Sequence, residues 1–431
     1  MARLRLLSLA LSTALITACG GGASDAPQNT PEPVVAGKIT LSGVVTDNPI
    51  VNASVMVRIA EDAFDDAPPT GSNGEFQLDI SSQNPEALVM AEALDAVNGV
   101  KLTAVLDTFA NYSAQARNGV VDGVKITNVT TALQVLVERL AADGSIDTFN
   151  EFHQLAGEVD ANELYELAAA IKVVVENIDG SVLPAGLANT EALARAIAAG
   201  QSSFLNDIAT TAPAALAEAR SKLLNDGNAT LPFEAVSAPG VYLSLSDNFT
   251  YAVFNNGTAL VDYGSDESVP GTPSWSLNDN GQIIVSFVGF ERATDSLSSI
   301  GAVGDVMHVV VETDFRNAQS VQASSVRKIN FAQGFDAASV PGSWIDGDME
   351  TSRWVFETGN QGYRLNTQTQ IQSDAFTWSI TSDGRINMLF TGTDESMQFA
   401  RLDDGDDAVL QVSRFNGEFA YLSTTTLTPE G

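Results

Sequence analysis

The side chains that most often carry enzymatic chemistry are scarce in this chain of 431 residues. It contains two histidines, His153 and His308, and a single cysteine, Cys19. A catalytic triad or a zinc site needs an imidazole with an orienting partner or with further ligands. The segment just before His153 supplies one carboxylate, Glu151, and His308 lies in an apolar run at 306–311 that is typical of a buried strand. Both histidines are therefore predicted to be structural.

Carboxylates are plentiful, and several gather in short turns. Residues 403–407 place four aspartates around a glycine, and Asp346, Asp348 and Glu350 alternate in another turn. Calcium takes oxygen ligands from such turns, but neither segment has the twelve-residue loop with its closing glutamate. We expect solvated acidic turns there, and a loop at the acidic stretch 61–66.

Other chemistries depend less on a short motif. The sequence has no phosphate-cradling Gly-rich loop and no His-Glu-x-x-His motif, so nucleotide and zinc-protease chemistry are not expected. A glycosidase needs only two carboxylates that the fold brings together, which an acidic chain can supply. A hydrolase with paired carboxylates is therefore kept as a third alternative. No catalytic, metal-binding or cofactor-binding residue is predicted.

All four tryptophans lie in the C-terminal part of the chain, at Trp275, Trp344, Trp354 and Trp378. Such a group suits stacking on a sugar or on a small apolar ligand. Trp275 and Trp378, however, occupy equivalent places in an internal repeat, which fits a shared core position at least as well. Because an aromatic side chain buries a large apolar area, we predict that they belong to the core.

Cys19 follows a short secretory pattern. Two arginines near the N-terminus precede an uncharged apolar stretch at 6–16, which is too short to span a bilayer. Residues 16–19 read Ile-Thr-Ala-Cys, and three glycines follow. This order resembles the lipobox of bacterial lipoproteins, and the resemblance implies that Cys19 is acylated and becomes the first residue of the mature chain. In that family an aspartate after the cysteine favours the inner membrane, so Gly20 implies the outer membrane.

The charge and composition limit the partners. The formal net charge is −33, and loss of the two arginines in residues 1–18 makes it −35. Such a surface repels nucleic acid and anionic lipid head groups, so the predicted membrane contact is the lipid on Cys19 and no nucleic-acid partner is expected. A hydrophobic content of 44% is typical of folded protein, and the length predicts two or three domains.

The N-terminal part divides into a signal peptide at 1–18, a lipidated Gly- and Pro-rich tether at 19–37 and a folded unit at 38–106. Alternating apolar residues at 39–45, 53–59 and 75–80 predict strands bounded by turns. The order of Ser-Gly-Val-Val-Thr-Asp, Val-Asn-Ala-Ser-Val and Asn-Gly-Glu-Phe-Gln-Leu resembles the carboxypeptidase regulatory-like (transthyretin-like) β-sandwich. That resemblance implies an accessory spacer or binding module without catalytic residues of its own.

A helical domain is predicted at 107–231: from about Thr127 to Leu231 the apolar period changes to that of helices, and we predict a bundle of about four. Thr131 and Gln134 have the spacing of a capping box, and Asp160 with Glu163 repeats this start signal. Pro213 opens a last helix that is expected to stop at Gly227.

The remaining chain contains an internal repeat, with copies at 232–335 and 336–431. The offset is 102 from Pro239 to Pro341 and 103 from Trp275 to Trp378. Phe254 corresponds to Phe356, and residues 305–307 correspond to 407–409, also at an offset of 102. Turn signals between apolar runs make each copy an antiparallel β unit. Residues 342–344, Gly-Ser-Trp, resemble the Gly-x-Trp that opens the first strand of lipocalin-like barrels, where the tryptophan plugs the closed end.

The predicted fold is multidomain α+β, with an N-terminal β-sandwich, a central helical bundle and two tandem antiparallel β units of small-barrel or lipocalin-like form. The predicted function is a non-enzymatic lipoprotein anchored to the outer membrane, facing the periplasm or the surface, with a structural or binding role in the cell envelope. The second alternative is binding of a small apolar or sugar ligand by the β units, and the third is an envelope hydrolase.

Overall fold

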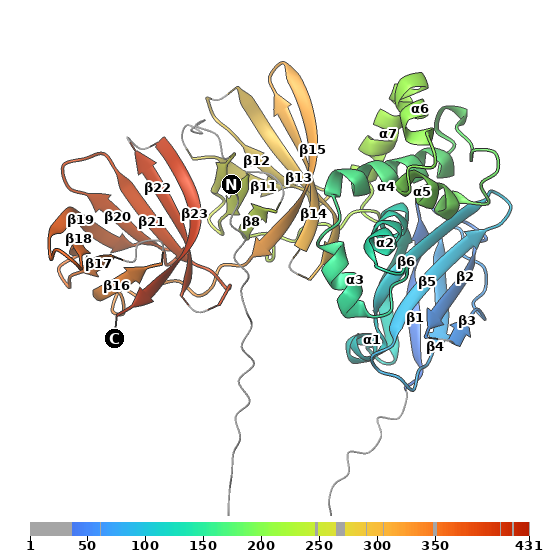
Figure 1. Ribbon diagram of the computed structural model, residues 1–431, viewed down its shortest axis with the longest axis horizontal. Coiled ribbons are helices and arrows are strands. Elements are labelled where there is room, and N and C mark those ends of the chain that lie inside the picture. Colours follow the sequence, from blue (N-terminus) through green and yellow to red (C-terminus); the bar gives the residue numbers. More distant parts are fainter. Residues whose placement is uncertain are drawn as a thin grey trace, which may run out of the picture.

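A computed structural model describes residues 37–60, 62–245, 249–263, 272–289, 291–304, 306–347, 351–405, 407–415 and 418–430. Figure 1 shows three bodies in a row: a β-sandwich packed with helices, a first β barrel and a second β barrel. The predicted multidomain α+β class with two barrel units is confirmed. Cys19, the predicted signal peptide and nearly all of the tether lie outside the described residues.

Two sheets form the sandwich. One has the order β4 (Glu75–Ile80), β1 (Ile39–Thr46), β7 (Val120–Thr127), and the other has the order β3 (Asp62–Phe64), β2 (Ser54–Ile59), β5 (Leu88–Asp95), β6 (Val100–Thr108). Alternation in sequence becomes alternation in burial: in β4 the apolar residues Phe76, Leu78 and Ile80 are buried and the polar ones between them are exposed. The predicted strands at 39–45, 53–59 and 75–80 are thus present.

The sandwich continues past residue 106, the boundary expected from sequence. After β6 the short helix α1 (Phe109–Gln115) carries the chain to β7, which pairs parallel to β1. At the register shift in this pair Gly43 lies so close to β7 that an added Cβ would stand 2.1 Å from the carbonyl oxygen of Val124. Glycine at 43 therefore permits the close approach of the two backbones.

Six described α-helices follow β7, where about four were expected. They are α2 (Asn128–Leu140), α3 (Phe149–Ala156), α4 (Ala161–Val175), α5 (Thr190–Ala198), α6 (Phe204–Thr211) and α7 (Pro213–Leu224). Asp160 caps α4 by accepting from the Glu163 amide, as predicted. The capping box of α2 is formed by Thr127 and Thr130, not by Thr131 and Gln134, because β7 runs directly into the helix and Thr131 already lies within it.

One core joins the sandwich to the helices. It contains Leu102 of β6, Leu136 of α2 and Leu164 of α4, all fully buried, together with Ile300 and Val310 from the first barrel. Burial of this size supplies most of the stabilisation, at about 25 cal/mol per Å² of apolar surface. The sandwich and its helices are therefore packed against one end of the first barrel through a shared core. No helix in the described part of the chain is long and apolar enough to cross a bilayer.

The first barrel has eight strands in the order β10-β9-β8-β15-β14-β13-β12-β11. Their bounds are β8 (Gly240–Ser244), β9 (Thr250–Val253), β10 (Ala259–Asp262), β11 (Ser274–Leu277), β12 (Ile283–Ser286), β13 (Arg292–Val303), β14 (Val306–Phe315) and β15 (Ala318–Ile329). A bridge between Thr258 and Ser274 joins the two ends of the sheet.

The second barrel is closed, with its strands in chain order from β16 to β23. Their bounds are β16 (Gly342–Asp346), β17 (Ser352–Phe356), β18 (Gln361–Asn366), β19 (Gln372–Ile380), β20 (Ile386–Phe390), β21 (Ser396–Arg401), β22 (Ala408–Phe415) and β23 (Glu418–Pro429). Eight strands leave an interior just wide enough for side chains or for one small ligand.

The two barrels are built alike at their closed ends. Tyr242 donates its hydroxyl to the carbonyl oxygen of Ala238, and Trp344 donates its indole N–H to that of Val340. Phe233 packs edge-on against Tyr242 at 5.8 Å, as Phe335 does against Trp344 at 6.0 Å. The end of each barrel that Phe233 or Phe335 covers is here called its closed end.

Strand pairing corrects two details of the repeat. Gly240 pairs with Val253, and Gly342 pairs with Phe356, so Phe356 corresponds to Val253 rather than to Phe254. The β16–β17 connection is one residue longer, which changes the offset from 102 to 103. Further along, β14 aligns Val309 with Val409 at an offset of 100, because the β13–β14 hairpin is longer and bulged.

Candidate functional site

Both histidines lie where the helices meet the first barrel. His308 of β14 is fully buried, and its Nδ1 lies 3.0 Å from the hydroxyl of Ser325, which in turn donates to the carbonyl oxygen of Val159. His153 of α3 covers Gly304 at the β13–β14 turn, where a Cβ would fall 1.8 Å from its Nε2. The burial of His308 and its hydrogen bond to Ser325 match the structural role expected for it.

The acidic turns make contacts within the protein. Asp404 forms an ion pair with Arg327 of the first barrel. Asp346 is buried, and its carboxylate accepts from the indole N–H of Trp354 at 3.2 Å and from the hydroxyl of Thr425 at 3.1 Å. Asp348, Glu350, Asp406 and Glu61 lie outside the described residues. The described part of the chain holds no group of three or more His, Cys, Asp or Glu side chains arranged for a metal ion.

Paired carboxylates, which a glycosidase needs, occur around Lys172 of α4. Its ammonium lies 2.5 Å from Asp47 and 2.8 Å from Glu176, and all three side chains are almost completely buried. Burial raises the pKa of Asp47 to about 7, against the effect of the adjacent lysine. Because Lys172 lies between the two carboxylates, this cluster is an internal ion pair that connects the sandwich to α4.

Three tryptophans take core positions. Trp275 and Trp378 donate their indole N–H groups to equivalent carbonyl oxygens, those of Phe254 and Glu357, which confirms their equivalence. Trp344 fills the closed end of the second barrel. Trp354 differs, because it is buried at the opposite end and borders an open cavity.

In the first barrel the end opposite the closed one, here called the mouth, is filled by polar side chains. Asp295 is fully buried and accepts hydrogen bonds from the hydroxyls of Tyr251 at 2.7 Å and Tyr263 at 2.5 Å. Arg292 lies 3.1 Å from the same carboxylate, with its guanidinium 3.9 Å from the centre of the Tyr263 ring. Burial and the nearby carboxylate hold the pKa of both tyrosines above its usual range. The carboxylate and both hydroxyls are thus hydrogen-bonded within the group, while the Nε of Arg292 is buried without a hydrogen-bond partner.

The mouth of the second barrel lacks this group. The pairing registers place Trp354 at the position of Tyr251, Asn366 at that of Tyr263 and Met397 at that of Asp295. A cavity of about 380 Å³ lies here, bordered by Trp354, Phe390, Met397 and Tyr421. In place of the carboxylate and its two phenol partners, the second mouth has space that no side chain fills.

Polar groups line the same cavity. Arg364 lies 3.5 Å from Asp374, with its guanidinium 5.6 Å from the centre of the Trp354 ring. The hydroxyl of Ser413 is buried and has no hydrogen-bond partner. A buried unsatisfied hydroxyl is costly, so it is usually satisfied by water or by a ligand. The mouth thus combines aromatic surface, a guanidinium with its carboxylate and a free hydroxyl.

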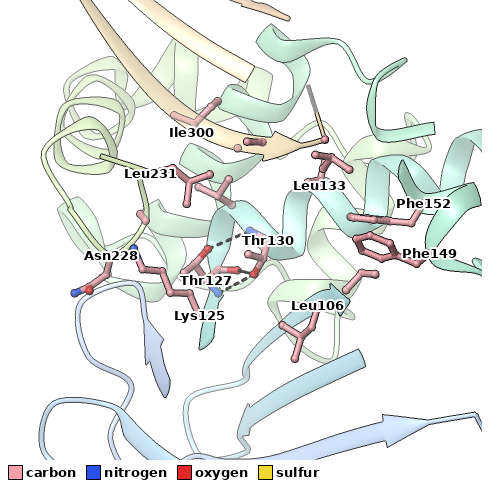
Figure 2. Close-up of a pocket in the computed structure, with 17 residues that line it drawn as sticks. Leu106, Lys125, Thr127, Thr130, Leu133, Phe149, Phe152, Asn228, Leu231 and Ile300 are labelled. Atoms are coloured by element: carbon pink, nitrogen blue, oxygen red, sulfur yellow. Dashed lines mark hydrogen bonds between the residues drawn. The ribbon is translucent and has the colours of Figure 1, made fainter. Parts of the chain in front are cut away.

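A second cavity, of about 250 Å³, lies where the sandwich, the helices and the first barrel meet (Figure 2). It is bordered by β6, the β7–α2 junction, α3, the segment after α7 and the end of β13. Figure 2 shows Lys125 and Asn228 on one side and Phe149 and Phe152 on the other. Sequence reasoning missed both cavities, because their walls come from segments that are distant in the chain.

Comparisons with protein-family models and with curated proteins find no match for this chain. The geometry of the site alone therefore carries the functional argument.

Proposed function

We propose that this protein is a non-enzymatic lipoprotein, anchored to the outer membrane through Cys19, whose second barrel binds a small ligand in its mouth. The observation that carries the binding role is the difference between the two mouths: Asp295 and its partners fill one, and a cavity of about 380 Å³ occupies the other. Because the two barrels are copies of one repeat, the mouth of the second barrel can be compared position by position with the filled mouth of the first.

The lining favours a sugar among the small ligands considered. A ring with hydroxyl groups presents apolar faces and, at its edge, both donors and acceptors. Trp354, Phe390 and Tyr421 offer aromatic surface, while Arg364 donates, Asp374 accepts and Ser413 can do either. A cavity with aromatic walls and a few convergent polar groups is the usual form of a small-molecule site.

The binding role is tested by titrating glucose and N-acetylglucosamine, with indole as the apolar probe, and following tryptophan fluorescence and the melting temperature. A native-state binder raises the melting temperature. Ser413→Phe fills the cavity and is expected to abolish the response. Ser379→Phe, on the exposed outer face of β19, is the matched control and should retain it. A response of equal size in Ser413→Phe, or none to any probe in the unmodified chain, would overturn the proposal.

The anchor is tested separately with Cys19→Ala and membrane fractionation. The variant is expected to appear in the soluble fraction, and the unmodified mature chain to carry acyl chains on its first residue in mass spectrometry. Each buried methylene contributes about 0.8 kcal/mol, so loss of the acyl chains removes most of the membrane affinity. Unchanged membrane association of the variant would contradict the anchor without bearing on the barrel.

A further inference from the structure

The cavity at the junction of helices and first barrel has one polar side and one apolar side. Lys125, Thr127 and Asn228 stand at one side, and Leu133, Phe149 and Phe152 at the other (Figure 2). Leu106 and Ile300 close it from opposite walls. Such a cavity suits an elongated molecule with a single polar head.

Lys125 gives the polar side its charge. Its ammonium donates to the carbonyl oxygens of Gly227 at 2.8 Å and Thr230 at 3.3 Å, which leaves one of its three N–H donors unused. Within the described chain it forms no ion pair. Lys38, Lys101, Lys172 and Lys222 each pair with a carboxylate, and among the described lysines Lys328 shares with Lys125 a bond to a backbone carbonyl oxygen in place of an ion pair.

The remaining walls offer little else to a polar group. The hydroxyls of Thr127 and Thr130 are already used in the capping box of α2. Burial lowers the pKa of Lys125, although the nearby carboxylate of Asp226 acts to raise it, and an anion bound beside the ammonium would raise it further. The unused N–H of Lys125 is therefore the principal donor available to a ligand head group.

We infer that this junction cavity binds a small apolar carboxylate, a medium-chain fatty acid or its equivalent, with the carboxylate on Lys125 and the hydrocarbon between Leu133, Phe149 and Phe152. The site is separate from the mouth of the second barrel. It includes β13 of the first barrel and α2 and α3 of the helical region, so the ligand contacts both bodies and its binding stabilises their packing.

The test compares octanoate with 1-octanol, which has the same chain without the charge, by isothermal titration calorimetry of the full chain at neutral pH and low salt. Octanoate is expected to bind about ten-fold more tightly, because its carboxylate can accept a charge-assisted hydrogen bond from Lys125 that is stronger than one to the hydroxyl of octanol. Equal affinity for the two probes, or no binding of octanoate, would overturn the proposal on the unmodified chain alone.

Variants then locate the site. Lys125→Met is expected to remove the preference for octanoate while leaving octanol binding unchanged. The matched control is Lys328→Met, since Lys328 is also half-buried, also donates to a backbone carbonyl oxygen and lies in the first barrel away from the cavity. Leu106→Trp, which fills the cavity from β6, should abolish binding of both probes. Retention of the preference in Lys125→Met would place the carboxylate elsewhere, and the barrel variant Ser413→Phe should bind octanoate normally.

Discussion

The two barrels share a scaffold and differ at the mouth. Both closed ends use a phenylalanine against an aromatic residue that donates to a carbonyl oxygen four positions earlier. At the mouth, the first barrel places Asp295 among two tyrosines and an arginine, whereas the second has Met397 and a cavity. The comparison teaches that the closed end maintains the barrel, while the mouth is free to be filled or left open.

The largest expected effect is at Asp295. Asp295→Ala leaves Arg292 and two tyrosine hydroxyls without their partner, and removal of one member of a buried charged group costs about 3–5 kcal/mol. Met397→Ala, at the equivalent position, removes apolar contacts beside an existing cavity and should cost about 2 kcal/mol. Urea denaturation of both variants checks this order. A smaller loss for Asp295→Ala than for Met397→Ala would contradict the role given to the carboxylate.

The next effect is a pH dependence of stability that arises from His308, in the β13–β14 hairpin of the first barrel. Burial lowers the pKa of His308 to about 4, so the folded state favours the neutral ring. As the pH falls from about 6.5 to 4, the unfolded chain takes up a proton that the folded chain does not, and stability falls by about 3 kcal/mol. The second barrel has Ala408 at this position. His308→Asn, which keeps a donor toward Ser325, should remove this part of the acid sensitivity in pH-dependent denaturation, and an unchanged acid slope would contradict it.

A smaller effect is expected at the tip of the same hairpin. Gly304 has φ +64° and lies under the ring of His153. Gly304→Ala should cost about 1–2 kcal/mol from the left-handed backbone, with an added steric term from the ring. The double variant Gly304→Ala/His153→Ala should recover the steric term, which a double-mutant cycle measures. Strict additivity of the two changes would show that the ring and the turn do not interact.

The smallest expected changes in stability come from one equivalent position in the two mouths, Ser413 in the second barrel and Thr313 in the first. Ser413→Ala removes a hydroxyl that has no partner, so stability should change by less than about 0.5 kcal/mol. Thr313→Ser, at the equivalent place beside Asp295, removes a methyl group from a packed mouth and should cost about 0.8 kcal/mol. Thermal denaturation of the two variants measures this difference in stability. A clear loss of stability in Ser413→Ala would show that the hydroxyl has a partner.

Local signals predicted the local structure. Alternation gave the strands of the sandwich, Asp160 gave the start of α4, and the spacing of Trp275 and Trp378 gave the duplication. One error arose because Thr131 with Gln134 has the usual Thr-x-x-Gln form, whereas the box that forms uses Thr127 with Thr130, a threonine in the place of the usual Glu or Gln. The parallel pairing of β7 with β1 was not predicted, because it joins segments separated by α1 and most of the sandwich.

The cavities were beyond sequence reasoning for a related reason. Trp354 stands 103 positions after Tyr251, whereas Met397 stands 102 positions after Asp295, so no single offset aligns both and the equivalences follow from the pairing registers. Lys125 carried no signal of its own, because whether a lysine has a counter-ion depends on which carboxylates the fold brings near it. The lipobox and the carboxypeptidase regulatory-like resemblance stay predictions.

The seam between the barrels has a consequence for shortened forms of the protein. The outer face of the first barrel presents Val241, Ala252 and Leu260 to Leu410 and Val412 of the second, and Phe254 stacks on Phe331 at 5.1 Å. A stop codon or a protease cut near residue 335 would expose this apolar surface on a fragment whose own hydrophobic cores remain intact. Such a fragment is expected to aggregate through the exposed surface. The second barrel therefore also protects the first barrel from aggregation.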